Sequence, residues 1–405
     1  MSAPGGAAPG SPLRAALPSV IGALVCVHAA MAATRVTASL LLLHLGYPEW
    51  TVGVLLALFA VAPIGLALWA GRLADRHGLH RPLGIGVAMG TLGSLVAVIS
   101  QHPAAMAVAA LATGGAIAVA AVGIQREAGL MARDASDLKR VFSWVALGPA
   151  LSNALAPVAV GLLIDHVGFR AGFIFAALLP LLAWGLGRRV PQGHTPAARR
   201  AEEDSRGRPR TAWGLLRLPA FRALLLVNLS LSACWDAHSF AVPVLGHARA
   251  MSASSIGLVL GAFAVAATLV RLAITRWADD LDEKRALRTA MALATGTCAV
   301  YYWLPGVGGM LLGSALLGLA LGSVQPMILA MIHQVTPADR HGQALGLRML
   351  ATNAATIVMP VGFGALAVVT GPAGPMWLMG AIVLAAQAPA SRIPAERTHQ
   401  VVQSP

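Results

Sequence analysis

A succession of long apolar runs constrains this chain more than any other feature of its sequence. A helix needs about 20 mostly apolar residues to cross the hydrocarbon core of a membrane. Runs of about that length occupy residues 18–45, 51–70, 82–100, 104–125, 141–163, 171–187, 221–245, 254–275, 286–304, 307–332, 343–369 and 374–390. With 57% hydrophobic and 11% charged residues, the chain has too few polar side chains to cover a soluble domain. The sequence therefore predicts an all-α polytopic membrane protein with about twelve spanning helices.

The apolar runs fall into two sets, which a polar and arginine-rich segment separates. We expect an N-terminal six-helix bundle over residues 18–187 and a C-terminal six-helix bundle over residues 218–390. The segment 188–217 contains proline and cannot bury a core, so it predicts a cytoplasmic linker. Residues 1–17 are rich in Gly, Pro, Ala and Ser and predict a disordered cytoplasmic tail, and residues 391–405 form a second cytoplasmic tail.

The distribution of basic residues predicts the orientation of the helices. On one side of the predicted membrane the connecting segments carry many basic residues, namely Arg72, Arg76, Arg81, Arg133, Lys139, Arg140, Arg276, Lys284, Arg285, Arg288, Arg340 and the arginines of the linker. The segments on the other side carry only Arg170 and Arg249. Cytoplasmic loops are enriched in Lys and Arg. We therefore expect both termini and the linker in the cytoplasm, in the inner membrane of a bacterium. The net charge of +13 reflects this orientation and not nucleic-acid binding.

The two sets of runs are repeats of each other. The charged stretch from Gly71 to Asp75 aligns with Thr275 to Asp279, so that Arg72 matches Arg276 and Asp75 matches Asp279. Three further pairs continue the alignment: Arg81 with Arg285, Gln125 with Gln325, and Asn153 with Asn353. Parallel repeats of this kind imply a pseudo-twofold axis along the membrane normal and a site near mid-membrane between the halves.

A resemblance to a known family rests on the first of these charged stretches. At their spacing, seven residues resemble the signature between helices 2 and 3 of major facilitator superfamily transporters: Gly71, Leu73, Ala74, Asp75, Arg76, Gly78 and Arg81. The helix number, the linker and the second, degenerate copy of the signature extend the resemblance over nearly the whole chain. It implies a secondary transporter with alternating access.

The resemblance also implies a cytoplasmic gate. In the family, the acid at the position of Asp75 meets a helix N-terminus and nearby arginines, and this contact latches the cytoplasmic side. A carboxylate at the positive end of a helix is stabilised by about 0.3–1 kcal/mol. Gly71 and Gly78 would permit close backbone approach. Alternatively, the charges of this stretch only anchor the topology.

One further segment favours export. Gly148 and Pro149 resemble the Gly-Pro of a motif linked to antiporters, although Ser152 and Asn153 stand where that motif has two glycines. The resemblance therefore assigns the superfamily and no subfamily. We expect export of the solute on this basis.

Two charged residues lie inside the predicted spans. A charge at mid-membrane costs at least about 2.5–3.5 kcal/mol, so such a residue is a functional candidate. Arg35 lies in the first span, on a face with His28, and Asp236 lies in the seventh, on a face with Asn228 and Ser232. Because these two spans are repeat partners that line the cavity in the family, we expect Arg35 and Asp236 to face each other or the substrate.

Each of the two charges can have a transport role. Arg35 offers a fork of donors to an anionic group of the substrate, and Asp236 can carry the coupled proton. The alternative is a static ion pair between Arg35 and Asp236 that fixes helix packing and touches no substrate.

Other polar residues of the predicted spans are weaker candidates for the central cavity. They are His238, Trp235, Asn153, Asn353, Gln125 and Gln325. Packing explains the ring residues, and hydrogen bonds between helices explain the amides, without any substrate. Four charged residues, Arg126, Glu127, Arg271 and Arg348, are expected near cytoplasmic ends, where snorkelling or gate ion pairs account for them.

No catalytic or metal-binding pattern occurs in the sequence. His and Cys do not cluster at metal-ligand spacing, there is no phosphate-binding glycine loop, and no cofactor is expected. The sequence therefore predicts a functional monomer that is not an enzyme and that exports a small polar or amphiphilic solute with protons as coupling ion. Its expected partners are that solute, protons and membrane lipid, without nucleic acid. The alternatives are proton-coupled uptake of an organic anion or similar metabolite, and a transport-inactive membrane sensor.

Overall fold

A computed structural model describes residues 16–131, 135–191, 212–276, 282–336 and 341–391. Nearly all of the predicted tail 1–17, most of the predicted linker 188–217 and the predicted tail 391–405 lie outside these residues. In the described part of the linker, Ala212–Arg217 forms a short 3-10 helix, η1.

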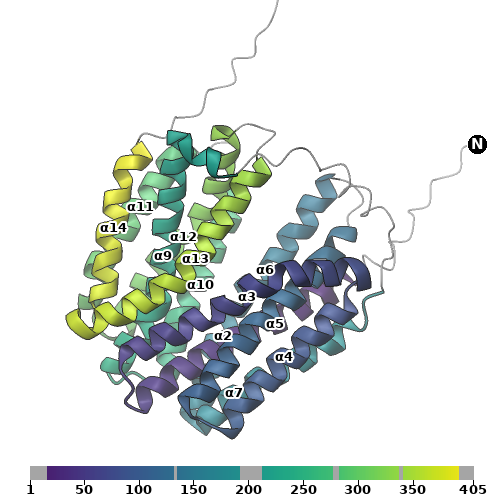
Figure 1. Cartoon of the computed structure of the whole chain (residues 1–405). Coiled ribbons are helices and arrows are strands. Elements are labelled where there is room, and N and C mark those ends of the chain that lie inside the picture. The colour runs from purple at the N-terminus through teal and green to yellow at the C-terminus, as the bar shows by residue number, and fades with distance from the viewer. Residues whose placement is uncertain (1–15, 132–134, 192–211, 277–281, 337–340, 392–405) are drawn as a thin grey trace, which may run out of the picture. The chain divides into compact units, whose positions relative to one another are not determined.

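Long helices account for almost all of the described chain (Figure 1). The first half contains α2 (Leu17–His44), α3 (Glu49–His77), α4 (His80–Ile99), α5 (Pro103–Leu130), α6 (Ala135–Val167) and α7 (Phe169–Gly187). The second half contains α9 (Pro219–Ala248), α10 (Ala253–Arg276), α11 (Glu283–Val300), η3 (Tyr301–Trp303), α12 (Gly306–Val335), α13 (His341–Thr370) and α14 (Gly374–Ser391). A helix satisfies all its backbone hydrogen bonds within one segment, which a membrane requires. The predicted all-α polytopic fold is confirmed.

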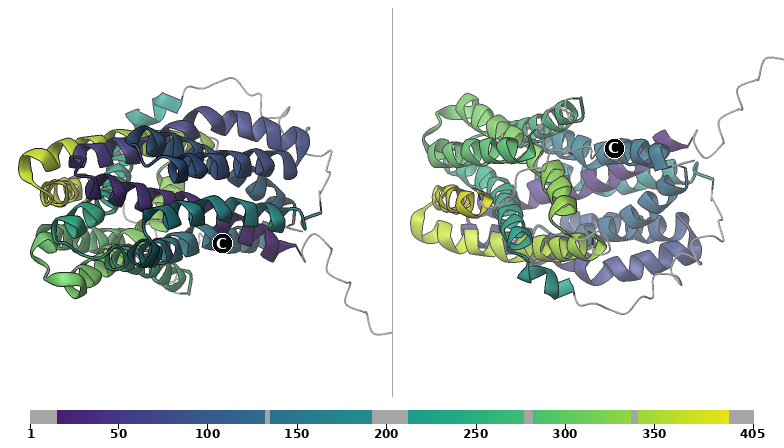
Figure 2. Two further views of the ribbon diagram at one scale, coloured as in Figure 1. Left: turned by 90° about the horizontal axis from the view of Figure 1, so that it is seen from below. Right: turned by 90° about the horizontal axis from the view of Figure 1, so that it is seen from above.

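The helices form two units. The first unit comprises Met1–Leu41 and Leu58–Arg206, and the second comprises Leu42–Ala57 and Gly207–Pro405. Within each unit, successive helices run antiparallel (Figures 1 and 2). In the first unit α4 packs against α5 and α7, and in the second unit α11 packs against α12 and α14. These are corresponding helices of the two repeats.

Helix α3 contributes to both units. Its first two turns, up to Ala57, belong to the second unit, where they cross α13. A Cβ atom on Gly53 would overlap the carbonyl oxygen of Pro360, and a Cβ atom on Gly364 would lie 2.6 Å from the Cα atom of Trp50. The crossing therefore requires glycine on both helices, as close helix packing in membranes commonly does.

The helices extend beyond the apolar runs at their charged ends. The stretch Gly71–His77 was predicted to lie in a loop, but it forms the last two turns of α3. Only Gly78 and Leu79 connect α3 to α4, and Gly78 has φ +67°, a left-handed conformation that ends helices. Lys139 and Arg140, also predicted in a loop, lie in α6. Nothing stops these helices at the membrane edge, because charged side chains are compatible with a helix in water.

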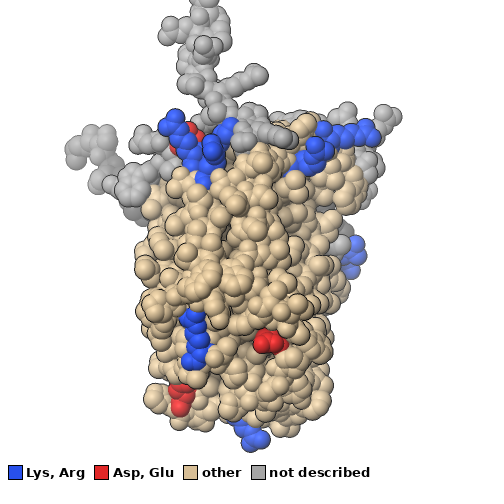
Figure 3. All heavy atoms as spheres, turned by 90° about the vertical axis from the view of Figure 1, so that its left-hand side faces the viewer, with Lys and Arg blue, Asp and Glu red and all other residues tan. Residues whose placement is uncertain are grey.

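The described surface is consistent with membrane embedding. Ten helices of the described chain are long and apolar enough to cross a membrane. Neither α11 nor α14 is among them, because α11 begins with several charged residues and the apolar stretch of α14, Gly374–Ala390, is short. On the face drawn in Figure 3, Lys and Arg side chains gather at one end, next to the undescribed segments, and a broad uncharged band adjoins them. The chain is a multi-pass membrane protein.

Candidate functional site

A chain of three hydrogen-bonded side chains lies inside the second unit. His238 of α9 is 1% exposed, and its Nε2 atom lies 2.8 Å from Oγ of Ser314 in α12. The hydroxyl of Tyr301 in η3 lies 2.6 Å from the same Oγ atom. A hydroxyl group can donate one hydrogen bond and accept others, so Ser314 can serve both neighbours at once. The three residues join three separate elements through one buried polar path.

Aromatic rings enclose this polar path. The imidazole of His238 stacks on Phe263 of α10 with ring centroids 4.3 Å apart and planes 20° apart. Tyr301 meets the imidazole edge-on at 6.0 Å, and Trp235 meets Phe263 edge-on at 4.5 Å. His238 and Trp235 are therefore packed against known partners within the second unit. Ser314 and Tyr301 were not predicted as site residues, because nothing in the sequence links positions so far from His238.

Asp236 is the buried acid of α9. Its exposed fraction is 7%, and it lies near the middle of a 30-residue helix. It lies two positions before His238, which corresponds to about 200° of rotation around the helix, so the two side chains leave α9 on different sides. Arg35, near the middle of α2, is half-buried and belongs to the first unit. The predicted encounter of Arg35 and Asp236 stays a prediction.

A second polar cluster connects α9 to α13. The Nδ2 atom of Asn228 donates to Oγ1 of Thr352 at 3.0 Å, and Nη1 of Arg348 donates to Oδ1 of Asn228 at 3.4 Å. Asn228 was predicted on the cavity face of Asp236; in the structure its amide is held by α13. Arg348, for which snorkelling seemed sufficient, instead reaches a buried amide.

Arg271 of α10 also has specific partners in the second unit. Its Nε atom donates to the carbonyl of Gly322 at 3.2 Å. Its guanidinium carbon lies 5.9 Å from the ring centroid of Trp235. This distance permits a cation–π interaction. The positive charge of Arg271 is thus held over one face of the Trp235 ring, where it would favour an anion or an electron-rich ring.

The candidate residues of the first unit mostly bond to their own helices. The Nδ1 atom of His28 lies 3.1 Å from the carbonyl of Leu24, and Nδ2 of Asn153 donates to the carbonyl of Pro149 at 2.9 Å. Asn153 is exposed; it was predicted as a cavity residue, with a hydrogen bond to a neighbouring helix as the alternative. Gln125 is exposed as well. A contact of either amide with a solute stays a prediction.

The remaining cavity candidates lie in the second unit. Ser232 is half-buried in α9, and Asn353 is exposed in α13. Gln325 lies in α12, but its side chain is outside the described part of the structure.

The candidate gate residues lie at the charged ends of the helices. Arg72, Arg76 and Arg81 are exposed, and Gly71 is half-buried. In the second repeat, Arg285 forms an ion pair with Asp282 at 3.0 Å, and the Asp282 carboxylate caps α11 by accepting the Arg285 backbone N–H. The side chains of Asp75 and Arg276, and the whole of Asp279, lie outside the described residues. The latch at Asp75 stays a prediction.

Glu127 is a candidate that sequence reasoning underestimated. It was assigned to a helix end, where a charge can snorkel, but its side chain is 0% exposed in α5. Its Oε2 atom lies 3.8 Å from Nη1 of Arg126. The signal was present in the sequence, because Glu127 falls within an apolar stretch, Pro103–Ala128, long enough to span a membrane.

The described residues contain no group of three or more His, Cys, Asp or Glu side chains that could hold a metal ion. The polar groups brought together are hydroxyls, amides, arginines and single acids. Such groups can bind a solute and hold or release a proton.

Comparison with known proteins assigns a family and a fold. The family model described as Major Facilitator Superfamily matches residues 20–309 and 224–403. The structure resembles that of the nucleoside transporter NupG, with a TM-score of 0.74 and 14% identity over 94% of this chain and 99% of that one. It also resembles a D-xylose-proton symporter, with a TM-score of 0.73 and 15% identity over 94% of this chain and 98% of that one. A peptide transporter, POT, in complex with sulfate has a TM-score of 0.67 and 16% identity over 96% and 100% of the two chains. At these identities the likeness concerns the fold.

Proposed function

Since the chain belongs to the major facilitator superfamily and is a membrane transporter, not an enzyme, we propose that it moves a small polar or amphiphilic solute by proton-coupled alternating access. The proposed organisation is a six-helix bundle over residues 18–187, a linker over 188–217 and a second bundle over 218–390. The solute would bind near mid-membrane.

The burial of Asp236 is the observation that carries the proposal. A carboxylate that is 7% exposed near the middle of a membrane-spanning helix is costly unless it has a function or a partner. The proton affinity of a carboxyl group depends on its solvation and on the charges near it. Asp236 can therefore change its proton occupancy when its surroundings change, as a coupling residue must.

Arg35 supports the proposal from the first repeat. Its guanidinium lies near the middle of α2 and can bind a carboxylate, a phosphate or several hydroxyl groups of a solute. In the proposed cycle, Asp236 takes up a proton from one side of the membrane and releases it on the other. Solute binding at Arg35 alternates with the two states of Asp236.

The path of α3 supports a conformational change between the units. Residues up to Ala57 belong to the second unit and residues from Leu58 belong to the first. Pro63 lies inside α3 close to this boundary, and proline removes a helix hydrogen bond and permits bending. Any rotation of one unit against the other must either bend α3 near Pro63 or separate the Gly53 crossing. We propose that one of these events accompanies transport.

The proposed direction is export across the inner membrane of a bacterium. Both termini and the linker would lie in the cytoplasm, because the basic residues gather at that end of the helices. A monomer would be the functional unit. Gly148 and Pro149 of α6 are the residues that favour export.

Proton-coupled uptake is the second candidate function. The D-xylose-proton symporter has the same fold over nearly its whole length, and its described activity is symport. The half-buried Arg35 would then attract an organic anion or similar metabolite from outside.

A reconstitution experiment distinguishes these candidates. The purified protein is placed in proteoliposomes with a pH gradient of either sign, and a panel of radiolabelled sugars, nucleosides, peptides, organic anions and amphiphilic cations is tested. Export predicts solute movement opposite to the proton flow, and symport predicts movement with it. Two results would contradict proton coupling. One is proton movement that requires no solute of any class, and the other is solute movement that a pH gradient of neither sign changes. A ligand that shifts the melting temperature without ever being transported would favour a membrane sensor.

A further inference from the structure

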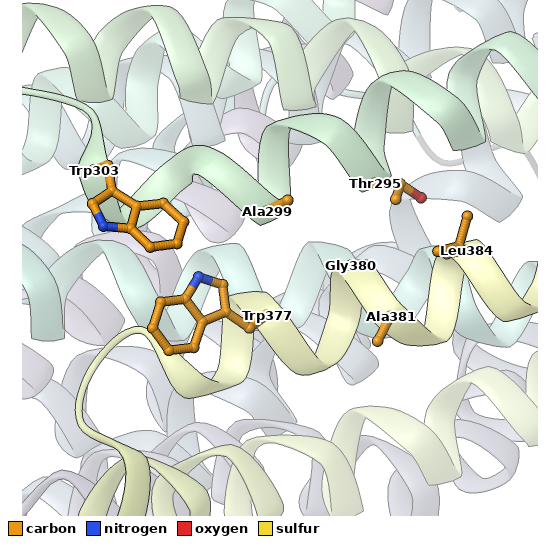
Figure 4. Close-up of a pocket in the computed structure, with 7 residues that line it drawn as sticks. All are labelled: Thr295, Ala299, Trp303, Trp377, Gly380, Ala381 and Leu384. Atoms are coloured by element: carbon orange, nitrogen blue, oxygen red, sulfur yellow. The ribbon is translucent and has the colours of Figure 1, made fainter.

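An apolar groove runs between α11 and α14 in the second unit (Figure 4). Its volume is about 460 Å³, within the usual range for small-molecule sites. Trp303 and Trp377 lie at one end, and Thr295 and Leu384 lie toward the other. Trp303 and Leu384 are 66% and 57% exposed, so the groove opens to the surroundings of the helices.

In the first repeat, a hydrogen bond joins the corresponding helices. There, the hydroxyl of Thr91 in α4 donates to the carbonyl of Ala177 in α7 at 3.2 Å. The spacing that separates Arg81 from Arg285 also separates Thr91 from Thr295, and α7 and α14 are the last helices of the two repeats. Thr295 and Ala381 both line the groove. The hydroxyl of Thr295 is buried and has no hydrogen-bond partner among the residues that the structure describes.

The two repeats differ in the hydrogen bonding of these corresponding threonines. An unpaired polar group in a membrane protein costs free energy, and the first repeat avoids that cost with one hydrogen bond. Several other threonines of spanning helices, such as Thr34 and Thr268, bond to a carbonyl of their own helix. In the described part of the second repeat, the hydroxyl of Thr295 makes no such contact with α14, and the groove lies beside it.

A positive charge with a fixed orientation lies beside the end of the groove that Trp303 and Trp377 form. The rings of Trp303 and Trp377 stack with centroids 5.4 Å apart, and Tyr302 meets Trp377 edge-on at 5.9 Å. The guanidinium carbon of Arg249 lies 5.7 Å from the centroid of the Tyr302 ring. Arg249 donates to the carbonyls of Leu304, at 2.8 Å, and of Tyr302. Its orientation is therefore fixed next to the aromatic cluster.

The aromatic residues indicate how the groove lies relative to a membrane. Tryptophan and tyrosine gather at the boundary between headgroups and hydrocarbon. Thr295 precedes Trp303 by two helical turns, which places it about 12 Å further along the helix. The groove thus runs from the headgroup level into the hydrocarbon, with a cation near its headgroup end.

We propose that the α11–α14 groove binds an anionic phospholipid, with one acyl chain in the groove and the phosphate near Arg249. The apolar walls match a hydrocarbon chain, and the arginine matches a phosphate, which guanidinium groups bind in a bidentate manner. The lipid would come from the leaflet at the Trp303 end of α11, opposite the Asp282 cap of the same helix. It would replace, in the second repeat, the packing that Thr91 and Ala177 supply in the first.

Native mass spectrometry of the delipidated, full-length protein tests the proposal. The probes are phosphatidylglycerol and phosphatidylcholine with identical acyl chains. Ala381 and Ala385 are both exposed on α14, one turn apart, but only Ala381 lines the groove. Ala381→Phe therefore fills the groove, and Ala385→Phe is the matched control. Arg249→Gln removes the charge, and Arg249→Lys keeps it.

The expected result is one retained phosphatidylglycerol per protein, bound about tenfold more tightly than phosphatidylcholine, because the choline cation of phosphatidylcholine cancels the net negative charge that Arg249 attracts. Ala381→Phe should abolish retention and Ala385→Phe should not. Arg249→Gln should remove the preference and Arg249→Lys should keep most of it, with folding of each variant checked by its melting temperature.

Three results would overturn the proposal. Equal affinity of the native protein for the two lipids would show that Arg249 does not select the anionic lipid. Equal behaviour of Ala381→Phe and Ala385→Phe would place the lipid elsewhere. A dimer that disappears only in Ala381→Phe would identify a second copy of this chain as the occupant. None of these measurements depends on transport, so they test this proposal separately from the proposed function.

Discussion

The Nε2 atom of His238 lies 2.8 Å from the hydroxyl oxygen of Ser314, and this contact ties α9 to α12 inside the second unit. Because Ser314 also serves the hydroxyl of Tyr301, its removal affects two buried polar groups. An unsatisfied buried donor or acceptor costs about 1–3 kcal/mol.

Replacement of Ser314 should therefore destabilise the protein more than replacement of an ordinary serine. We expect Ser314→Ala to lower the free energy of unfolding by about 1–3 kcal/mol, seen as a lower melting temperature in detergent. Ser230→Ala is the control, since the Ser230 hydroxyl donates only to the carbonyl of Leu226 in its own helix. Equal melting temperatures for the two variants would mean that the buried path has no net stabilising effect.

The helix crossing at Gly53 predicts a strong effect of a single methyl group. A Cβ atom there would overlap the backbone of Pro360, which cannot move as a side chain can. Gly53→Ala should cost about 1–3 kcal/mol of stability through overpacking. Gly65→Ala, in the same helix with nothing within 4 Å of the added atom, should be neutral or stabilise by up to about 1 kcal/mol. Thermal unfolding in detergent measures both, and a Gly53→Ala variant as stable as Gly65→Ala would show that the crossing is not close.

The positions of the helices could be predicted from the sequence because each apolar run is long and bounded by charges or turn residues. Length alone decides this, since no shorter helix crosses a membrane. The helix ends were less predictable. Hydropathy predicts Gly71–His77 as a charged loop, because it shows only where the apolar run ends. The helix continues beyond that point and ends at Gly78, whose backbone is left-handed.

The partners of the site residues could not be predicted. Asp236 and Arg35 stand out because a charge in an apolar run is rare. Ser314 and Tyr301 carry no such signal, and only the packing of α9 against α12 brings them to His238. The repeat in the sequence predicts that Thr91 and Thr295 correspond, but not that one is hydrogen-bonded and the other is not.

Asp236→Asn should uncouple transport from protons. The amide has nearly the same shape as the carboxyl group but cannot exchange a proton. We expect proteoliposomes with this variant to lose accumulation of the solute driven by a pH gradient while they retain solute exchange at equal pH. Asp282→Asn is the control, because Asp282 is exposed and asparagine caps a helix as well as aspartate does. Intact gradient-driven accumulation in Asp236→Asn would exclude this carboxyl group as the proton carrier.

Replacement of Arg35 distinguishes a substrate contact from a static ion pair. If Arg35 binds an anionic group, Arg35→Gln should weaken solute binding about tenfold or more, and Arg35→Lys should recover part of it. The melting temperature without solute should then change little. Solute-dependent thermal shifts measure both effects, with Arg170→Gln, an exposed residue of α7, as control. A variant that melts lower without solute, but still binds the solute normally, would favour the static pair.

Asp75→Asn tests the proposed cytoplasmic latch. A carboxylate at a helix N-terminus contributes about 0.3–1 kcal/mol, and an amide loses the charge that produces this effect. The substitution should therefore shift the balance between the inward-open and outward-open states by up to about fivefold, while solute affinity within each state stays the same. The measurements are the turnover rate in proteoliposomes and the equilibrium binding of the solute in detergent. A slower turnover with unchanged binding supports the latch, with Asp282→Asn again as control. A loss of binding with normal turnover of the remaining complex would instead place Asp75 at the solute site and contradict the latch.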